Sequence, residues 1–202
     1  MDSMGKDIGV LKDTRVICQR GATPLSMLTF IRLNRDIFSS PKIILLHVGT
    51  NYFGSKTEWS LFQNFKKGRI SEPEYERQLK MLNPLPAART PSDFQKTFED
   101  IIQEIRSINT VAQIIISGII PRPYDYHRRK SDIEAYNLIL HTFNSQHLIY
   151  YIPTFKPFLS NSLEIKEELF QEDVLHLSNR GSIVLRSFVC DKLNKAENRV
   201  LK

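Results

Sequence analysis

The chain has 202 residues and a formal net charge of +6, with 41% hydrophobic and 25% charged residues. This length indicates one domain that buries about 70% of its unfolded surface, and the composition excludes a disordered chain. No stretch approaches the ~20 apolar residues of a membrane span, and two cysteines, which we expect to be buried thiols, exclude a disulfide scaffold. We therefore expect a cytoplasmic globular protein.

Apolar runs rich in β-branched residues alternate with segments of helical period along most of the chain. In chain order, the expected elements are a strand over 14–19, a helix over 23–35, a strand over 42–48, a helix over 92–108, a strand over 113–119, a helix over 131–146, a strand over 148–153 and a helix over 178–195. Thr23 and Ser92 are the expected N-caps of the first two helices. This alternation predicts an α/β fold, with a parallel sheet covered by helices on both faces.

Residues 54–90 interrupt the alternation. The segment is polar, contains the single tryptophan, Trp59, and includes a helix-like stretch at 71–82. It directly follows the second expected strand, and a loop of this length is usually functional, so we interpret it as a cap over the strand ends. The spacing of Trp59, Phe62 and Phe65 fits either an apolar face over a site or packing within the domain.

Four short motifs lie where a parallel sheet would bring them together. They are DSMG at 2–5, RGAT at 20–23, GTN at 49–51 and DVLH at 173–176. Each follows an expected strand or precedes an expected helix, which places all four at one edge of the sheet.

Together these motifs supply the groups that acyl transfer to a serine requires. Ser3 is the candidate nucleophile, His176 is the candidate base, and Asp173, three residues earlier, is the carboxylate that orients the histidine. The candidate oxyanion donors are the backbone N–H groups of Ser3 and Gly21 and the side-chain amide of Asn51. The sequence therefore predicts a serine hydrolase site at this edge.

Each candidate also has a structural interpretation. Ser3 is a common residue type at the start of a helix, and Asn51 is a common one in a turn. His176 can be a loop histidine and Asp173 a solvated carboxylate. His47, inside an expected strand, is more typical of a packed core histidine than of a base. The presence of all four motifs favours the catalytic interpretation.

The set DSM, RGAT, VGTN and DVLHLS resembles the four motifs of the SGNH (GDSL-like) hydrolase family, in the same order over about residues 2–190. The resemblance implies a flavodoxin-like three-layer α/β/α fold and an esterase that uses neither a metal nor a cofactor. It maps the serine, glycine, asparagine and histidine of the family onto Ser3, Gly21, Asn51 and His176, with Asp173 as the partner of the histidine.

The sequence departs from the family pattern in three places. Met1 stands where the family usually has glycine, and Tyr52 stands where it usually has aspartate. The first strand of the family leads into the serine, whereas this sequence begins at the serine motif. We therefore expect the first strand to be missing.

We predict a single SGNH-hydrolase-like domain over residues 1–202, with a cap-like insertion at about 54–90, that hydrolyses small acetyl-like esters. The alternative is a catalytically degenerate binding module of the same fold, of the kind found in mobile-element proteins. The basic runs at 66–67 and 128–130 give only weak support to a nucleic-acid partner, because such runs are usually solvated.

Overall fold

A three-stranded parallel sheet lies at the centre of the molecule. The computed structural model describes residues 15–18, 21–52, 56–82 and 90–200. Within them, the sheet has the strand order β1-β2-β3. The strands are β1 (Ile43–Leu46), β2 (Gln113–Ser117) and β3 (Ile149–Ile152). Ile44 pairs with Ile114, and Ile115 pairs with Tyr150. The predicted parallel sheet is confirmed.

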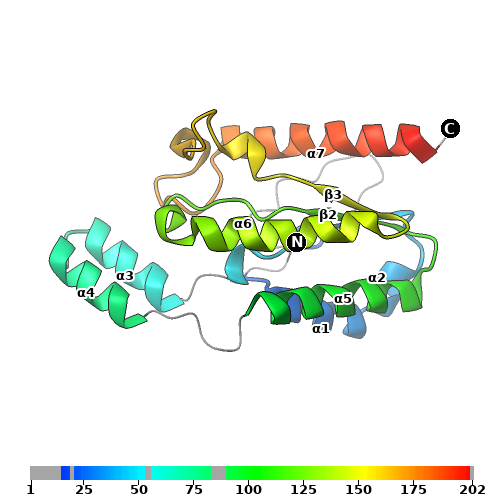
Figure 1. Cartoon of the computed structure of the whole chain (residues 1–202), viewed down its shortest axis with the longest axis horizontal. Helices are drawn as coiled ribbons and strands as arrows, with labels where there is room; N and C mark the ends of the chain where they lie inside the picture. The colour runs from blue at the N-terminus through cyan, green and yellow to red at the C-terminus, as the bar shows by residue number, and fades with distance from the viewer. Residues whose placement is uncertain (1–14, 19–20, 53–55, 83–89, 201–202) are drawn as a thin grey trace.

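Helices cover both faces of this sheet (Figure 1). The α-helices of the described residues are α1 (Pro24–Leu33), α2 (Arg35–Ser39), α3 (Lys56–Lys66), α4 (Glu72–Leu82), α5 (Pro91–Ile108), α6 (Tyr126–Thr142) and α7 (Asn179–Val200). Four short 3₁₀ turns lie at η2 (Thr50–Tyr52), η3 (Phe143–Ser145), η4 (Lys156–Phe158) and η5 (Glu167–Leu169). Ile114 and Ile116 face a core shared with α1, α2, α5 and α6, whereas Ile115 faces a core shared with α7. The result is the predicted three-layer α/β/α arrangement.

Local sequence signals explain where the two best-marked helices begin. Thr23 caps α1, and Pro24 occupies its first turn, as predicted. The cap of α5 is Thr90, not the predicted Ser92, because Pro91 already stands in the first turn and Asp93 completes a reciprocal capping box with Thr90. The apolar residues of α5 are buried on one face, as its periodicity predicts.

The strand predicted over 14–19 is wrong in the part that the structure describes. Residues 15–18 have no regular structure, and their side chains are exposed or half-buried. Among the described residues the sheet consists of β1, β2 and β3, with β1 at one edge. The expectation of buried thiols is also wrong, because Cys18 is exposed and Cys190 is half-buried.

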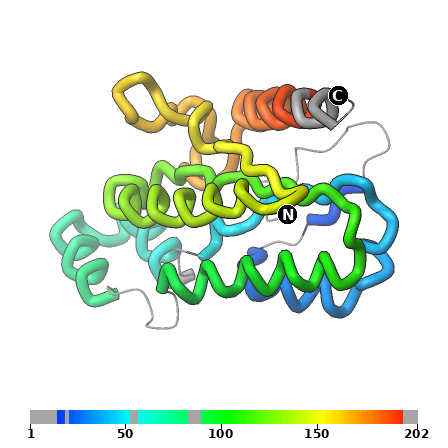
Figure 2. The backbone as a smooth tube through the Cα atoms, turned by 45° about the vertical axis from the view of Figure 1, so that its right-hand side comes forward, coloured from blue at the N-terminus to red at the C-terminus, as the bar shows by residue number. Residues whose placement is uncertain are grey.

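The segment predicted as a cap forms a helical hairpin. Its helices, α3 and α4, pack side by side at the end of the molecule toward which the strands run (Figures 1 and 2). Leu61, Phe62, Tyr75 and Leu79 form its buried core, and the rings of Phe65 and Tyr75 stack with centroids 4.8 Å apart. The sequence analysis predicted α4 but not α3.

None of the helices in the described part of the chain is long and apolar enough to cross a membrane.

Candidate active site

Asp173 and His176 form a tightly held pair in the loop before α7. Oδ2 of Asp173 lies 2.5 Å from Nδ1 of His176. Oδ1 of Asp173 accepts the backbone N–H groups of Leu175 and His176, each at 2.9 Å. The turn therefore fixes the carboxylate, and the carboxylate in turn fixes the ring. This is the pairing that the sequence predicts for a base and the group that orients it.

The charge state of Asp173 suits this orienting contact. Burial raises the pKa of the carboxyl group, but the hydrogen bonds from the His176 ring and from the N–H groups of His176 and Leu175 outweigh burial and hold the pKa below its ordinary value of 3.8. Asp173 is therefore ionised at neutral pH and acts only as a hydrogen-bond acceptor.

The turn that carries the pair adopts a strained backbone conformation. Val174 has a φ of 52°, in the left-handed region that β-branched residues rarely enter. Its carbonyl oxygen accepts the N–H of Tyr124 at 3.3 Å, and its side chain packs against the aromatic core of the hairpin. The N–H of Gln171 also bonds the carbonyl of His176 at 2.8 Å. Contacts from three directions thus stabilise a turn that the local sequence does not favour.

Gly49 explains why the strand β1 is followed by a sharp change in direction. Its φ is 134°, and a Cβ atom at this position would lie 2.9 Å from Cγ1 of Ile119. Only glycine fits both the backbone angle and the space. The chain then enters η2, which presents Asn51 at the carboxyl end of the sheet.

Asn51 lies beside the Gly21 loop. Nδ2 of Asn51 donates a hydrogen bond to the carbonyl oxygen of Ala22 at 3.3 Å. Gly21 has a φ of 73°, and, its chain neighbours aside, none of the described residues has an atom within 4 Å of the position that its Cβ would occupy. Two of the predicted oxyanion donors are therefore close together, and Gly21 faces open space.

Arg122 and Tyr124 connect these two halves of the site, and the sequence analysis missed both. Arg122 is 3% exposed, and its Nη1 donates to the carbonyl oxygen of Thr50 at 2.8 Å. Its Nε and Nη2 both bond the carboxylate of Asp125. Burial lowers the pKa of Arg122, but the Asp125 carboxylate more than offsets this and keeps the guanidinium charged. The available signal was the run PRPYD directly after a buried strand.

Ser3 lies outside the described residues, and its role stays a prediction. The structure brings Asp173 to His176 and brings Asn51 to the loop of Gly21. His47 is a packed core histidine, as interpreted from the sequence: it is 1% exposed, and its Nδ1 lies 2.5 Å from Oγ of Ser117.

The hairpin is joined to the main body beside this site. Trp59 packs edge-on against Tyr124, with centroids 5.2 Å apart, and stacks on Phe62. Glu58 is 4% exposed and accepts a hydrogen bond from Nη2 of Arg129 at 2.9 Å. The interpretation of 128–130 as a solvated basic run is therefore wrong for Arg129, which is buried in this ion pair.

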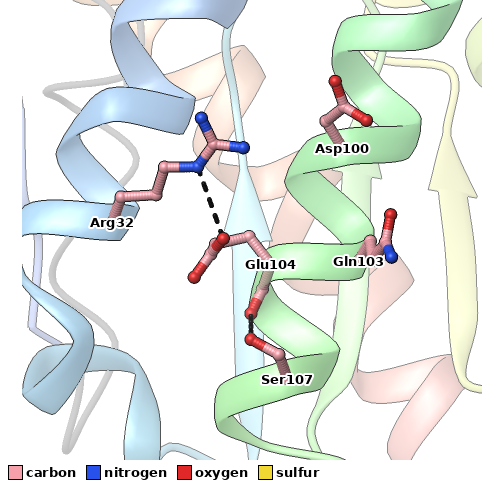
Figure 3. A pocket seen from close by; sticks show the side chains of 5 residues that line it. All are labelled: Arg32, Asp100, Gln103, Glu104 and Ser107. Atoms are coloured by element: carbon pink, nitrogen blue, oxygen red, sulfur yellow. Dashed lines mark hydrogen bonds and ion pairs between the residues drawn. The ribbon is translucent and has the colours of Figure 1, made fainter.

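A polar hollow of about 260 Å³ between α1 and α5 is separate from this site (Figure 3). Arg32, Asp100, Gln103, Glu104 and Ser107 line it. Nε of Arg32 bonds Glu104 at 3.4 Å, and Glu104 and Ser107 belong to the end of α5 that is remote from Asn51. Among the residues with described positions, no group of three or more His, Cys, Asp or Glu side chains could hold a metal ion.

Comparisons with known proteins agree with this fold. One similar solved structure is a lipase from a goat rumen metagenome, with a TM-score of 0.61 and 14% identity; the match covers 94% of this chain and 93% of that one. A lipase/acylhydrolase from Enterococcus faecalis has a TM-score of 0.58 and 16% identity, and the match covers 89% of this chain and 74% of that one. An acetyl esterase variant with an acetate ion has a TM-score of 0.53 and 13% identity, and the match covers 95% of this chain and 82% of that one. At these identities the structures establish the fold alone. No curated protein matches the chain, and nothing in the comparisons supports a nucleic-acid partner. The family model of GDSL-like lipases and acylhydrolases matches residues 19–182, most of the sequence, and the chain therefore belongs to the GDSL-like Lipase/Acylhydrolase family.

Proposed function

We propose that this chain is a serine esterase that hydrolyses esters of small, acetyl-like acyl groups. Ser3 is the nucleophile, His176 is the general base, and Asp173 orients His176. The observation that carries the proposal is the 2.5 Å contact between Asp173 Oδ2 and His176 Nδ1, with the carboxylate anchored by two backbone N–H groups. A histidine held in one orientation by an ionised carboxylate can take the proton of a serine hydroxyl.

In the proposed first step, Oγ of Ser3 forms a bond to the carbonyl carbon of the ester, and its proton moves to Nε2 of His176. The tetrahedral intermediate carries its negative charge on the former carbonyl oxygen. The C–O bond to the alcohol then breaks, and the alcohol leaves with the proton from His176. Water, activated by His176, hydrolyses the acyl-serine in the same way and releases the carboxylic acid.

The oxyanion donors are the N–H groups of Ser3 and Gly21 and the amide of Asn51. The amide nitrogen of Asn51 has two hydrogens, and only one is needed for the bond to the carbonyl of Ala22. That bond orients the group, and the second hydrogen is left for the oxyanion. Because glycine has no side chain, a substrate can come close to the backbone of Gly21.

We propose that the α3–α4 hairpin caps the site within a single domain and that the acyl group is small. The aromatic side chains of the hairpin pack against one another and against Tyr124, so they are engaged in protein contacts. One of the similar structures is an acetyl esterase. The intact Asp173–His176 pair argues against the alternative of a degenerate binding module.

The test is the hydrolysis of p-nitrophenyl acetate, butyrate and octanoate by the purified chain and by its Ser3→Ala and His176→Ala variants. We expect turnover to be fastest with the acetate and to fall to the background level in both variants, because the members of a triad act as a unit.

His147→Ala is the matched control for His176→Ala. Aryl esters react slowly with any accessible imidazole, and His147 is exposed, so this variant measures how much of the rate comes from such a background reaction. This variant should keep the rate of the wild type. Equal rates in the wild type and Ser3→Ala would exclude Ser3 as the nucleophile, and a preference for octanoate would exclude the small acyl group.

A further inference from the structure

Arg122 is buried at the centre of the site without belonging to any predicted motif. It follows β2, and it is 3% exposed. Three of its nitrogens have partners: Nη1 bonds the carbonyl of Thr50 at 2.8 Å, and Nε and Nη2 bond the two carboxylate oxygens of Asp125. The rigid planar guanidinium therefore donates to Thr50 on one side and to Asp125 on the other.

The bond from Arg122 to Thr50 connects Arg122 to the proposed oxyanion donor, Asn51. Thr50 immediately precedes Asn51, so the bond from Arg122 fixes the peptide group on which Asn51 is carried. On the other side, the Asn51 amide bonds the carbonyl of Ala22. The Asn51 amide is thus held through both its backbone and its side chain.

A further contact of Arg122, made by the face of the guanidinium and not by its donors, leads to the base. Cζ of Arg122 lies 4.9 Å from the centre of the Tyr124 ring, and the N–H of Tyr124 bonds the carbonyl of Val174. Val174 adjoins Asp173 and precedes His176 by two residues. A continuous chain of contacts therefore runs from the Asn51 loop through Arg122 and Tyr124 to the turn that carries the base.

We propose that Arg122 is a positioning residue for ester hydrolysis: it holds the Asn51 amide at a fixed place relative to the Asp173–His176 turn. The inference rests on the function proposed above. Arg122 acts through Asn51 and not on the substrate itself, because its nitrogens already bond Thr50 and Asp125. Its effect falls on the step in which the oxyanion forms, since Asn51 stabilises charge that develops only there.

The geometry favours arginine over any other cation. Lysine carries the same charge but has only one nitrogen at its end. That nitrogen cannot bond both oxygens of Asp125 and also the carbonyl of Thr50, as the three nitrogens of the planar guanidinium do. Arg122→Lys therefore keeps the charge and releases the Asn51 loop. Because misplacement of a catalytic group by about 1 Å can cost about 100-fold in rate, we expect kcat to fall about 10- to 100-fold, with KM changed less than about 3-fold.

The decisive experiment is a double-mutant cycle on p-nitrophenyl acetate with Arg122→Lys, Asn51→Ala and both together. If Arg122 acts through Asn51, the double variant is no slower than Asn51→Ala alone, within about 2-fold. If the two losses multiply, Arg122 acts independently of Asn51 and the inference is overturned. An unchanged kcat in Arg122→Lys overturns it as well.

Arg106→Lys is the matched control. Arg106 also bonds backbone carbonyls, those of Ala112 at 2.6 Å and Leu148 at 3.1 Å, but at the opposite end of the sheet. This variant should lose stability without losing kcat. A similar loss of kcat in Arg106→Lys would show that general loosening of the fold is responsible, and would overturn the positioning role.

Two further results keep the outcomes distinct. If circular dichroism shows that Arg122→Lys does not fold, Asp125→Asn replaces it in the double-mutant cycle, because this substitution removes the carboxylate that orients Arg122. An unchanged kcat in Asp125→Asn overturns the inference. A wild type without Ser3-dependent turnover overturns the proposed function and this inference together, whereas an active wild type with an unaffected Arg122→Lys overturns this inference alone.

Discussion

Asp173 gives the site a dependence on pH that can be measured without a substrate. Its pKa in the folded chain is held below the ordinary value of 3.8 by the hydrogen bonds from His176 and Leu175. A group whose pKa is lowered by folding stabilises the fold above its unfolded pKa, and this contribution is lost as the pH falls through the folded pKa. The carboxylate therefore supports the site turn at neutral pH but not in strong acid.

We expect Asp173→Asn to be less stable than the wild type at pH 7 and the difference to shrink below about pH 4. Asparagine keeps an oxygen that can accept the backbone N–H groups, so the variant removes the charge and leaves the turn. Urea unfolding of both proteins between pH 3 and 7 measures the gap. A gap that grows as the pH falls would contradict the lowered pKa.

At the scale of elements, the hairpin depends on one buried ion pair. Glu58 is 4% exposed and lies 2.9 Å from Nη2 of Arg129 and 3.6 Å from Nη2 of Arg128. A buried ion pair adds little net stability, but removal of Glu58 takes the nearer carboxylate from the buried Arg129 and leaves it only the more exposed Asp132, 3.3 Å from its Nη1. The joint between hairpin and body is therefore sensitive to the loss of Glu58.

We expect Glu58→Gln to lower the free energy of unfolding by about 1–3 kcal/mol, less than for a fully unpaired buried charge, because Asp132 still pairs with Arg129. Glu74→Gln is the matched control, because Glu74 pairs with Arg77 on the exposed surface of the same hairpin, where solvent screens the charges. Trp59 fluorescence during urea titration reports on the hairpin. Equal midpoints for the two variants would show that the Glu58 contact does not secure it.

Elements that depend on their own sequence were predictable, and those that depend on distant partners were not. The apolar face of α5 and the cap of α1 are local features, and the sequence analysis found both. The strand expected over 14–19 was wrong for residues 15–18, because whether an apolar run joins a sheet depends on the rest of the fold and not on the run itself.

The same division holds for the site. The Asp173–His176 pair could be predicted because its members are three residues apart in one turn. The position of Arg122 after a buried strand marked it as a candidate, but its role could not be predicted, because it depends on a contact with Thr50, 72 residues away in sequence. Arg129 belongs to a basic run that is typical of a solvated surface, and only its long-range contact with Glu58 of the hairpin shows that it is buried. Long-range pairing of polar groups leaves no periodic pattern in a sequence.

At the scale of the whole molecule, the central strand β2 contributes to both cores, as β3 does through Ile149 and Ile152. Ile114 and Ile116 of β2 face the core of α5 and α6, and Ile115, 0% exposed, faces the core of α7. Because β2 cannot leave one core without leaving the other, we expect the two helical layers to unfold together. The hairpin should join the same transition, since its aromatic core includes Tyr124 and Val174 of the body.

Ile115→Ala tests this unity because the substitution lies on the α7 face and outside the hairpin core. Truncation of a fully buried isoleucine costs about 2–5 kcal/mol. Trp59, the single tryptophan of the chain, lies in the hairpin, so its fluorescence reports on the hairpin alone. If the molecule is one cooperative unit, Ile115→Ala shifts the urea midpoint measured by Trp59 fluorescence as much as the midpoint measured by far-ultraviolet circular dichroism. A shift in circular dichroism alone would mean that the hairpin unfolds independently, and the contacts through Glu58 and Tyr124 would then not couple it to the turn that carries Asp173 and His176.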